Sequence, residues 1–459
     1  MIPVSLREIA RVVEGTLYDV PDPEARVVAP AVVDSREVVP GGLFAATAGL
    51  RVDGHNYVAD AVAAGAVAVL ATRPVGVPAL VVADVQRALA KLAAYLLERV
   101  RPVVIGLTGS VGKTTTKDLL AQVLERHAPT IATDRSFNNE IGLPLTVLRA
   151  DAATRYLVLE MGASRKGDIT YLTGIARPSI GLVLNVGTAH MARMGRGLAD
   201  VASAKGELVE ALPPDGVALL NADDSYVMGM AGRTTAQIVT YGRASSAHVR
   251  AERVRMGERA RAVFDLVTPS GRAGVRLGVM GEHQVANALA AAAAATVFGL
   301  TAPEIAEGLS TARRRSSGRL EVTDRPDGVT VVNDAYNASP ESVRAGLRTL
   351  KALAGARRTI AVLGAMGQQA AASRTLHEQV GRLAAELGVH VLVAVGPGDP
   401  VAMARAAESA RLGIEVHTVE DVTGAVRLTG ELLEPGDVVL VKASSEVGLD
   451  ACARALAGT

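Results

Sequence analysis

The most constraining feature of the sequence is a short apolar strand that recurs along the chain and ends each time in small or polar residues. VVIGLT (Val103 to Thr108) is the first clear copy, and RYLVLEMG, IGLVLNVG and GVALLNAD follow it. Helical stretches lie between them, which predicts a parallel sheet with helices on both faces, and ligands bind such sheets at the carboxyl ends of the strands. Four polar residues fall at that edge: Glu160, Asn185, His190 and Asn221.

Two stretches divide the chain into three α/β domains. QRALAKLAAYLLERV places Leu89, Leu92 and Leu96 at helical spacing, which predicts an amphipathic helix before a domain boundary. ARRRSSGRL (Ala312 to Leu320) is basic and predicts a flexible linker, and four further strand-like segments follow it. We expect a small α/β uridine-nucleotide domain (1–98), a central P-loop parallel-sheet ATPase domain (99–315) and a C-terminal Rossmann-like α/β domain (316–459).

A phosphate-binding loop is predicted by TGSVGKTTT (Thr108 to Thr116), which lies between a strand and a helix. Gly109 and Gly112 allow the backbone to approach a ligand closely, and the free N–H groups of a helix N-terminus attract phosphates. The segment is not a strict Walker A motif, because Leu107 stands where that motif has its first glycine.

The polar side chains of this loop suit a nucleotide. Lys113 can reach the β- and γ-phosphates of ATP, and the hydroxyl of Thr114 or Thr115 can bind Mg²⁺. An NTPase, a kinase and a ligase would all use such a loop, so the motif alone does not identify a reaction.

Composition and charge exclude several classes of protein. The net charge of +1 gives no global field for nucleic acid or an anionic membrane, and the single Cys452 excludes an internal disulfide. The N-terminal segment is charged where a signal peptide would be apolar, and no apolar run approaches the ~20 residues that span a bilayer. We therefore expect a cytoplasmic protein that binds no nucleic acid and does not insert into a membrane. We also expect a monomer, although these properties do not determine the oligomeric state.

A series of short motifs runs through almost the whole chain. DSREVVPGGLFAA and GLRVDGHNY precede the phosphate loop, and SFNNEIGLPLTVL follows it. Further along stand VLEMGA, LNVGTAH, AKGELVEALP, NADD, GEHQVANALAA, GRLEV and NDAYNASPES. Each motif alone is weak, but the ordered series resembles the Mur ligase family of peptidoglycan synthesis.

The resemblance implies an ATP-dependent carboxylate–amine ligase that forms ADP. The implied donor is a UDP-linked acyl compound, UDP-N-acetylmuramoyl-tripeptide, and the implied acceptor is a small amine or dipeptide, D-alanyl-D-alanine. The donor carboxylate would attack the γ-phosphate to give an acyl phosphate, from which the amine then displaces phosphate. Catalysis of this kind depends on positioning and on charge neutralisation by Mg²⁺ and cationic side chains.

The resemblance also implies a metal site close to the catalytic Lys113. Thr114, Glu160 and His190 would bind Mg²⁺, and Lys205 would react with CO₂ to give a carbamate that binds it as well. Without the resemblance, Glu160 would be interpreted as a helix cap, His190 as a hydrogen-bonding histidine and Lys205 as a surface lysine.

Further residues are assigned to ligands by the same resemblance. Asn287, which shares a helix face with His283, would contact adenine, and Arg319 and Asp334 would reach ATP when the third domain closes. Contacts to the substrates are implied for Ser35, Arg36, Asn138, Asn139, Tyr336 and Asn337. Capping, turn or solvated roles are the alternatives for these residues.

The sequence departs from the family pattern in the third domain. GAMGQQA (Gly364 to Ala370) lacks two usual carboxylates, Ser445 replaces the arginine of a KASR motif, and Ser339 replaces an asparagine. In the central domain, the linker MARMGRGLAD after His190 also lacks a usual acidic residue. Because the changes cluster where the family binds the amine, a related ligase that uses another amine in a specialised-metabolite pathway is an alternative. A non-catalytic nucleotide-binding scaffold and a folylpolyglutamate-type ligase are further alternatives.

Overall fold

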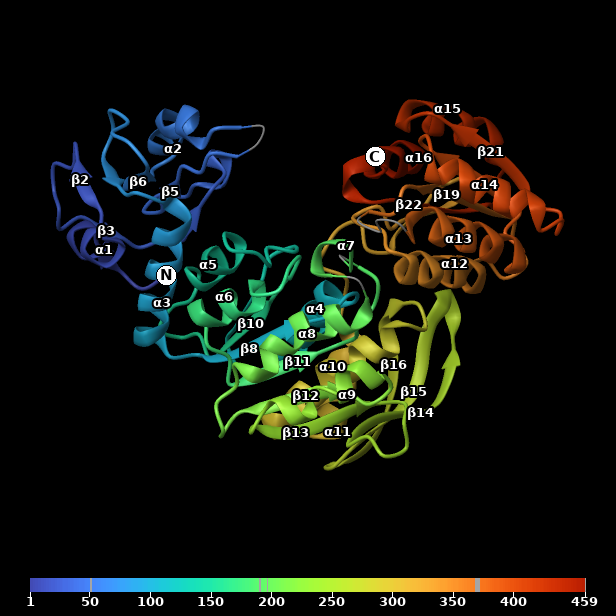
Figure 1. The fold of residues 1–459 in the computed structure, drawn as a ribbon, viewed down its shortest axis with the longest axis horizontal. Helices are drawn as coiled ribbons and strands as arrows, with labels where there is room; N and C mark the ends of the chain where they lie inside the picture. The colour runs from blue at the N-terminus through green and yellow to red at the C-terminus, as the bar shows by residue number, and fades with distance from the viewer. Residues whose placement is uncertain (50–51, 190, 196, 368–371, 459) are drawn as a thin grey trace.

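The computed structural model describes residues 1–49, 52–189, 191–195, 197–367 and 372–458, and it contains three α/β domains in chain order (Figure 1). Each domain is built around its own main sheet. Within the described residues, none of the helices is both long enough and apolar enough to cross a bilayer.

The first domain has a five-stranded sheet in the order β2-β7-β6-β5-β4. Its elements are β1 (Val4–Ser5), α1 (Leu6–Val13), β2 (Thr16–Tyr18), β3 (Arg26–Val27), β4 (Ala31–Val32), η1 (Ser35–Glu37), β5 (Leu43–Ala45), η2 (Gly54–Tyr57), α2 (Val58–Ala63), β6 (Ala68–Ala71), β7 (Ala79–Val81) and α3 (Val85–Val100). The predicted amphipathic helix is confirmed as α3. Asp84 caps its first turn by accepting from the N–H of Arg87 at 3.0 Å, and Leu89, Leu92 and Leu96 are buried.

The central domain has a nine-stranded sheet in the order β16-β15-β14-β13-β12-β11-β8-β10-β9. Its strands are β8 (Val103–Thr108), β9 (Thr130–Ala132), β10 (Tyr156–Glu160), β11 (Ile180–Val183), β12 (Val217–Asn221), β13 (Gln237–Gly242), β14 (Val249–Met256), β15 (Arg261–Thr268) and β16 (Gly271–Met280). Its helices are α4 (Lys113–Glu125), α5 (Gly142–Val147), α6 (Asp168–Ile175), α7 (Met191–Met194), α8 (Leu198–Glu210), α9 (Ser225–Met228), α10 (Gln284–Val297) and α11 (Ala302–Thr311), with short turns η3 (Ala231–Arg233) and η4 (Glu258–Ala260).

The parallel part of this sheet is covered on both faces, as the sequence predicts. Along β10, Tyr156 and Val158 enter the core formed with α4, α10 and α11, while Leu157 and Leu159 enter the core on the side of α5, α6 and α8. The two cores follow from the alternation of side chains along a strand. Glu160 ends the strand at the carboxyl edge.

The strands β14 to β16 were not anticipated from the sequence, and they extend the sheet in antiparallel pairs. Burial alternates strictly along β15, with every second residue buried. Such alternation is typical of an antiparallel sheet with one covered face and one solvated face.

The third domain has a six-stranded sheet in the order β17-β18-β22-β19-β20-β21, in which β17 alone pairs antiparallel within the described residues. Its elements are β17 (Glu321–Asp324), β18 (Thr330–Asn333), α12 (Pro340–Ala354), β19 (Thr359–Gly364), α13 (Ser373–Glu386), β20 (Val391–Val395), α14 (Asp399–Ser409), β21 (Glu415–Val419), α15 (Val422–Leu432), β22 (Val438–Lys442), η6 (Ser445–Val447) and α16 (Asp450–Ala457). Apolar cores fill both faces of the sheet.

The predicted linker, residues 312–320, has no helix or strand, but it is bound to the central domain rather than free. The main chain of Arg313 is hydrogen-bonded to Gln122, and the N–H of Ser316 donates to Asp118 at 3.2 Å. The third domain therefore follows a segment that lies along α4.

Candidate active site

A cleft of about 1200 Å³ lies between the central and third domains. The phosphate loop and the carboxyl ends of the central strands form one wall, and α12 with the segment after β18 forms the other. The cleft therefore lies at the sheet edge where the sequence predicts a ligand site.

The phosphate loop is fixed from two sides. The side-chain oxygen of Asn185 accepts from the N–H groups of Ser110, at 3.1 Å, and Val111, at 2.9 Å. Gly112 has a φ of 85°, and a Cβ there would lie 2.3 Å from Oδ1 of Asn287. Gly109 packs against Leu184, where a Cβ would lie 2.8 Å from the leucine Cβ. Both glycines are thus required by close packing, and Asn287 lies directly against the loop.

Lys113 is folded back into its own loop, where Nζ donates to the carbonyl of Gly109 at 2.8 Å. Desolvation lowers the pKa of Lys113, and the charge of Arg319 lowers it further, whereas Glu160 opposes the shift. The ammonium group is therefore close to a second cation and a carboxylate, an arrangement that a polyphosphate would stabilise.

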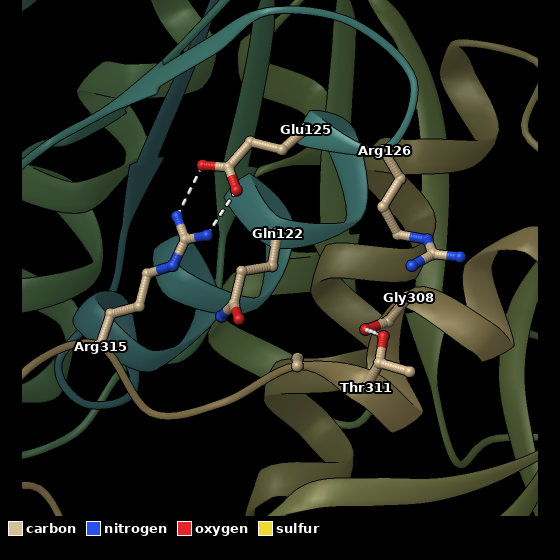
Figure 2. A pocket seen from close by; sticks show the side chains of 7 residues that line it. Gln122, Glu125, Arg126, Gly308, Thr311 and Arg315 are labelled. Atoms are coloured by element: carbon tan, nitrogen blue, oxygen red, sulfur yellow. Dashed lines mark hydrogen bonds and ion pairs between the residues drawn. The ribbon is translucent and has the colours of Figure 1, made fainter.

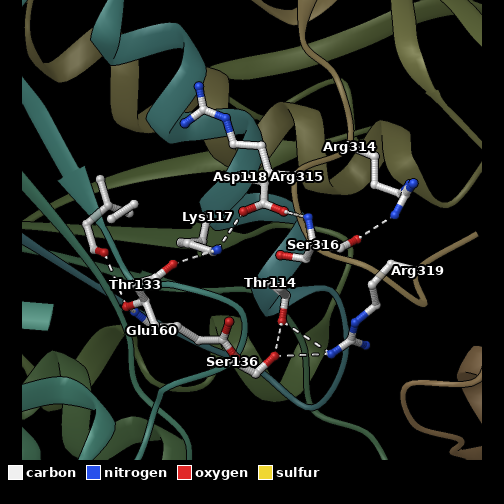
Figure 3. Close-up of polar contacts among 12 residues, drawn as sticks. Thr114, Lys117, Asp118, Thr133, Ser136, Glu160, Arg314, Arg315, Ser316 and Arg319 are labelled. Carbon is white, nitrogen blue, oxygen red and sulfur yellow. Dashed lines mark hydrogen bonds and ion pairs between the residues drawn. The ribbon is translucent and has the colours of Figure 1, made fainter. Parts of the chain in front are cut away.

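Thr114 joins the two domains through hydroxyl contacts at the start of α4 (Figure 3). Its Oγ1 lies 2.9 Å from Oγ of Ser136, and Nη2 of Arg319 lies 3.3 Å from Thr114 and 3.4 Å from Ser136. The guanidinium also lies over the ring of Tyr336, 4.2 Å from its centroid. Arg319 lies at the start of the third domain, and its side chain thus reaches the phosphate loop of the central domain.

Glu160 is buried at the end of β10. Its Oε1 accepts from Nδ2 of Asn138 at 2.6 Å, and its main-chain N–H donates to Thr133. Its Oε2 is buried without a hydrogen-bond partner. An orphaned carboxylate oxygen in the same cleft as the Thr114 hydroxyl fits the oxygen donors that Mg²⁺ prefers. No group of three or more His, Cys, Asp or Glu side chains arranged for a metal occurs in the described ranges.

Lys205 is not a surface lysine, because its side chain is among the largest that are fully buried. Burial lowers its pKa well below the usual value, and the charge of Lys113 acts in the same direction. The neutral amine is thereby favoured, which is the form that reacts with CO₂. His190, the other predicted ligand, lies outside the described residues.

The third-domain wall carries a buried ion pair. Nζ of Lys442 lies 2.5 Å from Oδ2 of Asp334 and donates to the carbonyl of Asn337 at 3.0 Å. The other carboxylate oxygen of Asp334 accepts from the N–H of Leu320 at 3.1 Å. Asp334 thus fixes the residue after Arg319, while Tyr336 and Asn337 are exposed in the cleft.

His283 and Asn287 both line the cleft, at the start of α10. Nδ2 of Asn287 donates to Gln284 at 2.6 Å, which leaves Oδ1 against Gly112. Burial lowers the pKa of His283 to about 4, although Asp334 opposes the shift, so the imidazole is neutral at pH 7.

Comparison with known proteins identifies the family. Three family models match the chain in order: the Mur ligase family catalytic domain at residues 32–104, the Mur ligase middle domain at 107–295, and the Mur ligase glutamate ligase domain at 318–445. A curated UDP-N-acetylmuramoyl-tripeptide–D-alanyl-D-alanine ligase from Mycobacterium leprae is 45% identical, over 100% of this chain and 99% of the relative. The chain belongs to the Mur ligase family.

Solved structures agree with this assignment and with the predicted three-domain α/β fold. MurF from Acinetobacter baumannii has a TM-score of 0.86 at 31% identity, with 100% of this chain and 99% of that chain covered. MurF from Thermotoga maritima, in complex with ADP, has a TM-score of 0.78 at 27% identity, with 94% and 98% covered.

Some predicted site residues of this Mur ligase lie outside the cleft. Arg36 is exposed on η1 and pairs with Asp34 at 2.6 Å, where its hydrogen bonds lower the pKa of Asp34 to about 2. Ser35 belongs to the same short turn, far along the chain from the cleft walls. Asn139 is exposed, and its side chain accepts from the N–H of Gly142 at 2.9 Å.

Two residues of this Mur ligase that contact both domains were not predicted. Ser136, from SFNNE, contacts Thr114 and Arg319. Oε1 of Glu341, at the start of α12, accepts from the N–H and the hydroxyl of Thr188, each at 2.9 Å, while Oε2 is buried without a partner. Ser339 caps the N-terminus of the same helix. Asparagine, which the family usually has at this position, is an equally good helix cap.

Proposed function

We propose that this chain joins D-alanyl-D-alanine to UDP-N-acetylmuramoyl-tripeptide in an ATP-dependent step of peptidoglycan precursor synthesis. The observation that carries the proposal is the full-length match, at 45% identity, to a relative named for this reaction. The cleft adds the chemistry such a ligase needs: a phosphate loop, a buried carboxylate and two cationic side chains in one place.

In the proposed reaction, a carboxylate oxygen of the UDP-linked peptide attacks the γ-phosphorus and ADP leaves. The dipeptide nitrogen then attacks the acyl carbon, loses a proton, and displaces phosphate. Lys113 and Arg319 would neutralise the phosphates, and the N–H groups of the loop from Gly109 to Thr115 would hold them. Asn287 would contact adenine, and Asp334 would act by holding the Arg319 segment.

The acyl donor would be positioned by the other predicted residues. Asn138 donates a hydrogen bond to Glu160, which supports a position near the γ-phosphate, and Asn139 follows it in the chain. Tyr336 and Asn337 line the cleft from the third domain. Ser35 and Arg36 would contact the uridine diphosphate in the first domain, Arg36 after releasing Asp34.

Mg²⁺ would be held by Thr114, Glu160 and His190, together with Lys205 as its carbamate, and it would supply charge neutralisation for the phosphates. The orphaned oxygen of Glu160 and the lowered pKa of Lys205 support this set. Lys205→Ala is expected to abolish turnover, with partial rescue by small carboxylates such as formate. Full activity without rescue would refute the carbamate.

The acceptor wall contains the departures from the family pattern. Ser445 lines the cleft, and so do Arg344 and Arg454, each of which carries a guanidinium that would suit a dipeptide carboxylate. Gln368 to Ala370 lie outside the described residues. We propose that the acceptor is retained because cations remain on this wall despite the loss of the KASR arginine.

The test is release of phosphate with UDP-N-acetylmuramoyl-tripeptide, ATP, Mg²⁺ and a panel of amines. Turnover with D-alanyl-D-alanine is expected. Turnover with another amine alone would instead support the specialised-metabolite alternative, and no turnover with any amine would favour the scaffold. We also propose a cytoplasmic monomer, which gel filtration would contradict by a dimer-sized peak.

A further inference from the structure

One face of α4 holds the segment that leads into the third domain. Thr114, Asp118, Gln122 and Glu125 recur at helical spacing, so they form a stripe along the helix. All four contact residues between Arg313 and Arg319. Figure 3 shows Thr114 and Asp118, and Figure 2 shows Gln122 and Glu125. The helix that begins with the phosphate loop is therefore also the surface on which the third domain is attached.

We propose that Asp118 and Gln122 are positioning residues for nucleotide binding. They fix residues 313–316 on α4 and thereby place Arg319 against Thr114. The inference deepens the proposed function and rests on it, because Arg319 is taken there to contact ATP.

Gln122 binds the segment through its main chain. Its Nε2 donates to the carbonyl of Arg313 at 2.8 Å, and its Oε1 accepts from the N–H of the same residue at 2.9 Å. The amide thus satisfies both main-chain groups of one residue, as a neighbouring strand would do. The contact does not involve the side chain of Arg313, so Arg313→Ala provides a matched control.

Asp118 is the buried anchor, with 6% of its surface exposed. Its Oδ2 accepts from the N–H of Ser316 at 3.2 Å, and its Oδ1 lies 2.5 Å from Nζ of Lys117. Lys117 also donates to the carbonyl of Thr133 at 2.7 Å. A buried carboxylate needs such partners, so the position of Ser316 is fixed by the same network that satisfies Lys117.

Glu125 completes the stripe at the surface, where it forms an ion pair with Arg315 through both oxygens (Figure 2). The hydrogen bonds that Arg315 donates to Glu125 raise the pKa of Arg315. The pair borders a polar crevice of about 250 Å³ between α4 and α11. Exposed pairs contribute little, so Asp118 and Gln122 are the residues on which the position depends.

Arg319 lies between two anchors that belong to different domains. Ser316 is bound to Asp118 of the central domain, and Leu320 is bound to Asp334 of the third. Three residues reach at most ~10 Å, so a displacement of Ser316 is transmitted to Arg319. If the third domain rotates with both anchors in place, the change in main-chain direction would fall on Ser317, Gly318 and Arg319.

The experiment compares Gln122→Ala, Asp118→Ala and Asp118→Asn with Arg313→Ala as the control. For each variant, KM is measured for ATP and for the UDP-linked tripeptide, and the affinity for Mg²⁺ and AMP-PNP is measured by calorimetry without any acceptor. Gln122→Ala and Asp118→Ala are each expected to raise the KM for ATP and the Kd for AMP-PNP about tenfold, the free energy of roughly one hydrogen bond, with the donor KM unchanged. Arg313→Ala is expected to have the same KM values and the same AMP-PNP affinity as the wild type.

Asp118→Asn separates positioning from stability. Asparagine keeps an acceptor for Ser316 but loses the ion pair with Lys117, so stability in urea should fall while nucleotide affinity stays near that of the wild type. Equal loss of affinity in Asp118→Asn and Asp118→Ala, or wild-type affinity in Gln122→Ala, would overturn the proposal. If Asp118→Ala does not fold, Gln122→Ala decides. Because AMP-PNP binding needs no acceptor, a wild type that fails with D-alanyl-D-alanine would count against the proposed function alone.

Discussion

The central domain meets the first domain through an apolar helix and meets the third through polar side chains. Leu89, Leu92 and Leu96 of α3 belong to one core that continues from the first domain into the central domain. At the other junction, the core of the third domain reaches the central strands through Met280. The remaining contacts described above are hydrogen bonds and ion pairs, such as those of Arg319 and Glu341.

The difference indicates which domain moves. Separating an apolar junction exposes surface to water at roughly 25 cal/mol per Å², whereas polar contacts can be exchanged for water at little net cost. The first domain is therefore expected to unfold together with the central domain, and the third to rotate and unfold more independently.

The largest expected effect comes from the apolar junction. Leu96 is fully buried, so Leu96→Ala should lower the free energy of unfolding by about 2–5 kcal/mol through lost burial and a cavity. Urea unfolding followed by circular dichroism measures this, with Glu98→Ala on the exposed face of α3 as the control. A separate transition for the first domain alone would contradict the shared core.

The next effect concerns Cys452, which is buried in the third-domain core. Burial raises the pKa of its thiol to about 11. Because the thiolate is the reactive form, labelling with a disulfide reagent at pH 8 should be at least ~100-fold slower than for a free thiol and should accelerate as pH rises toward 11. Fast labelling of the native protein would show that this core opens readily.

The same thiol sharpens the comparison between junctions. Labelling of Cys452 in increasing urea reports unfolding of the third domain. Its midpoint should stay unchanged in Leu96→Ala, because the polar junction transmits little of the destabilisation. A shift equal to that of the global transition would mean that the three domains unfold as one unit.

The sequence predicted the elements that carry a strong local pattern. The leucine spacing of α3 and the glycines of the phosphate loop each satisfy a local geometric need, and both were placed correctly. The strands β14 to β16 were not anticipated, because a half-covered strand such as β15 lacks the continuous apolar run that marks a fully buried strand.

The contacts across the domains were harder to predict for physical reasons. Gln122 and Asp118 bind main-chain groups of Arg313 and Ser316. Because every residue type has these groups, the identity of the partner gives no indication of the contact. Glu341 stands in the first turn of α12, where an acidic residue is expected merely to suit the helix dipole. Lys205 lies on an amphipathic helix, and its burial results from the packing of α8 on the sheet.

A smaller effect is expected at Glu341, which joins the third domain to Thr188. Glu341→Ala removes two hydrogen bonds across the polar junction, so kcat/KM for ATP should fall about tenfold while the free energy of unfolding changes by less than about 1 kcal/mol. Steady-state kinetics and urea unfolding measure the two quantities, with Glu386→Ala in the same domain as the control. Loss of stability without loss of activity would show that Glu341 supports folding instead.

The smallest effect is expected at Arg259, which forms an ion pair with Asp324 at 2.7 Å across the same junction. Both side chains are about half exposed, at 51% and 50%, so the pair is solvated and screened by salt. Arg259→Ala should change stability by less than about 1 kcal/mol and kcat/KM by less than about twofold. If it instead impaired ATP turnover more than Glu341→Ala does, the third domain would be positioned by surface charge, and the buried contacts at Thr114 and Thr188 would be secondary.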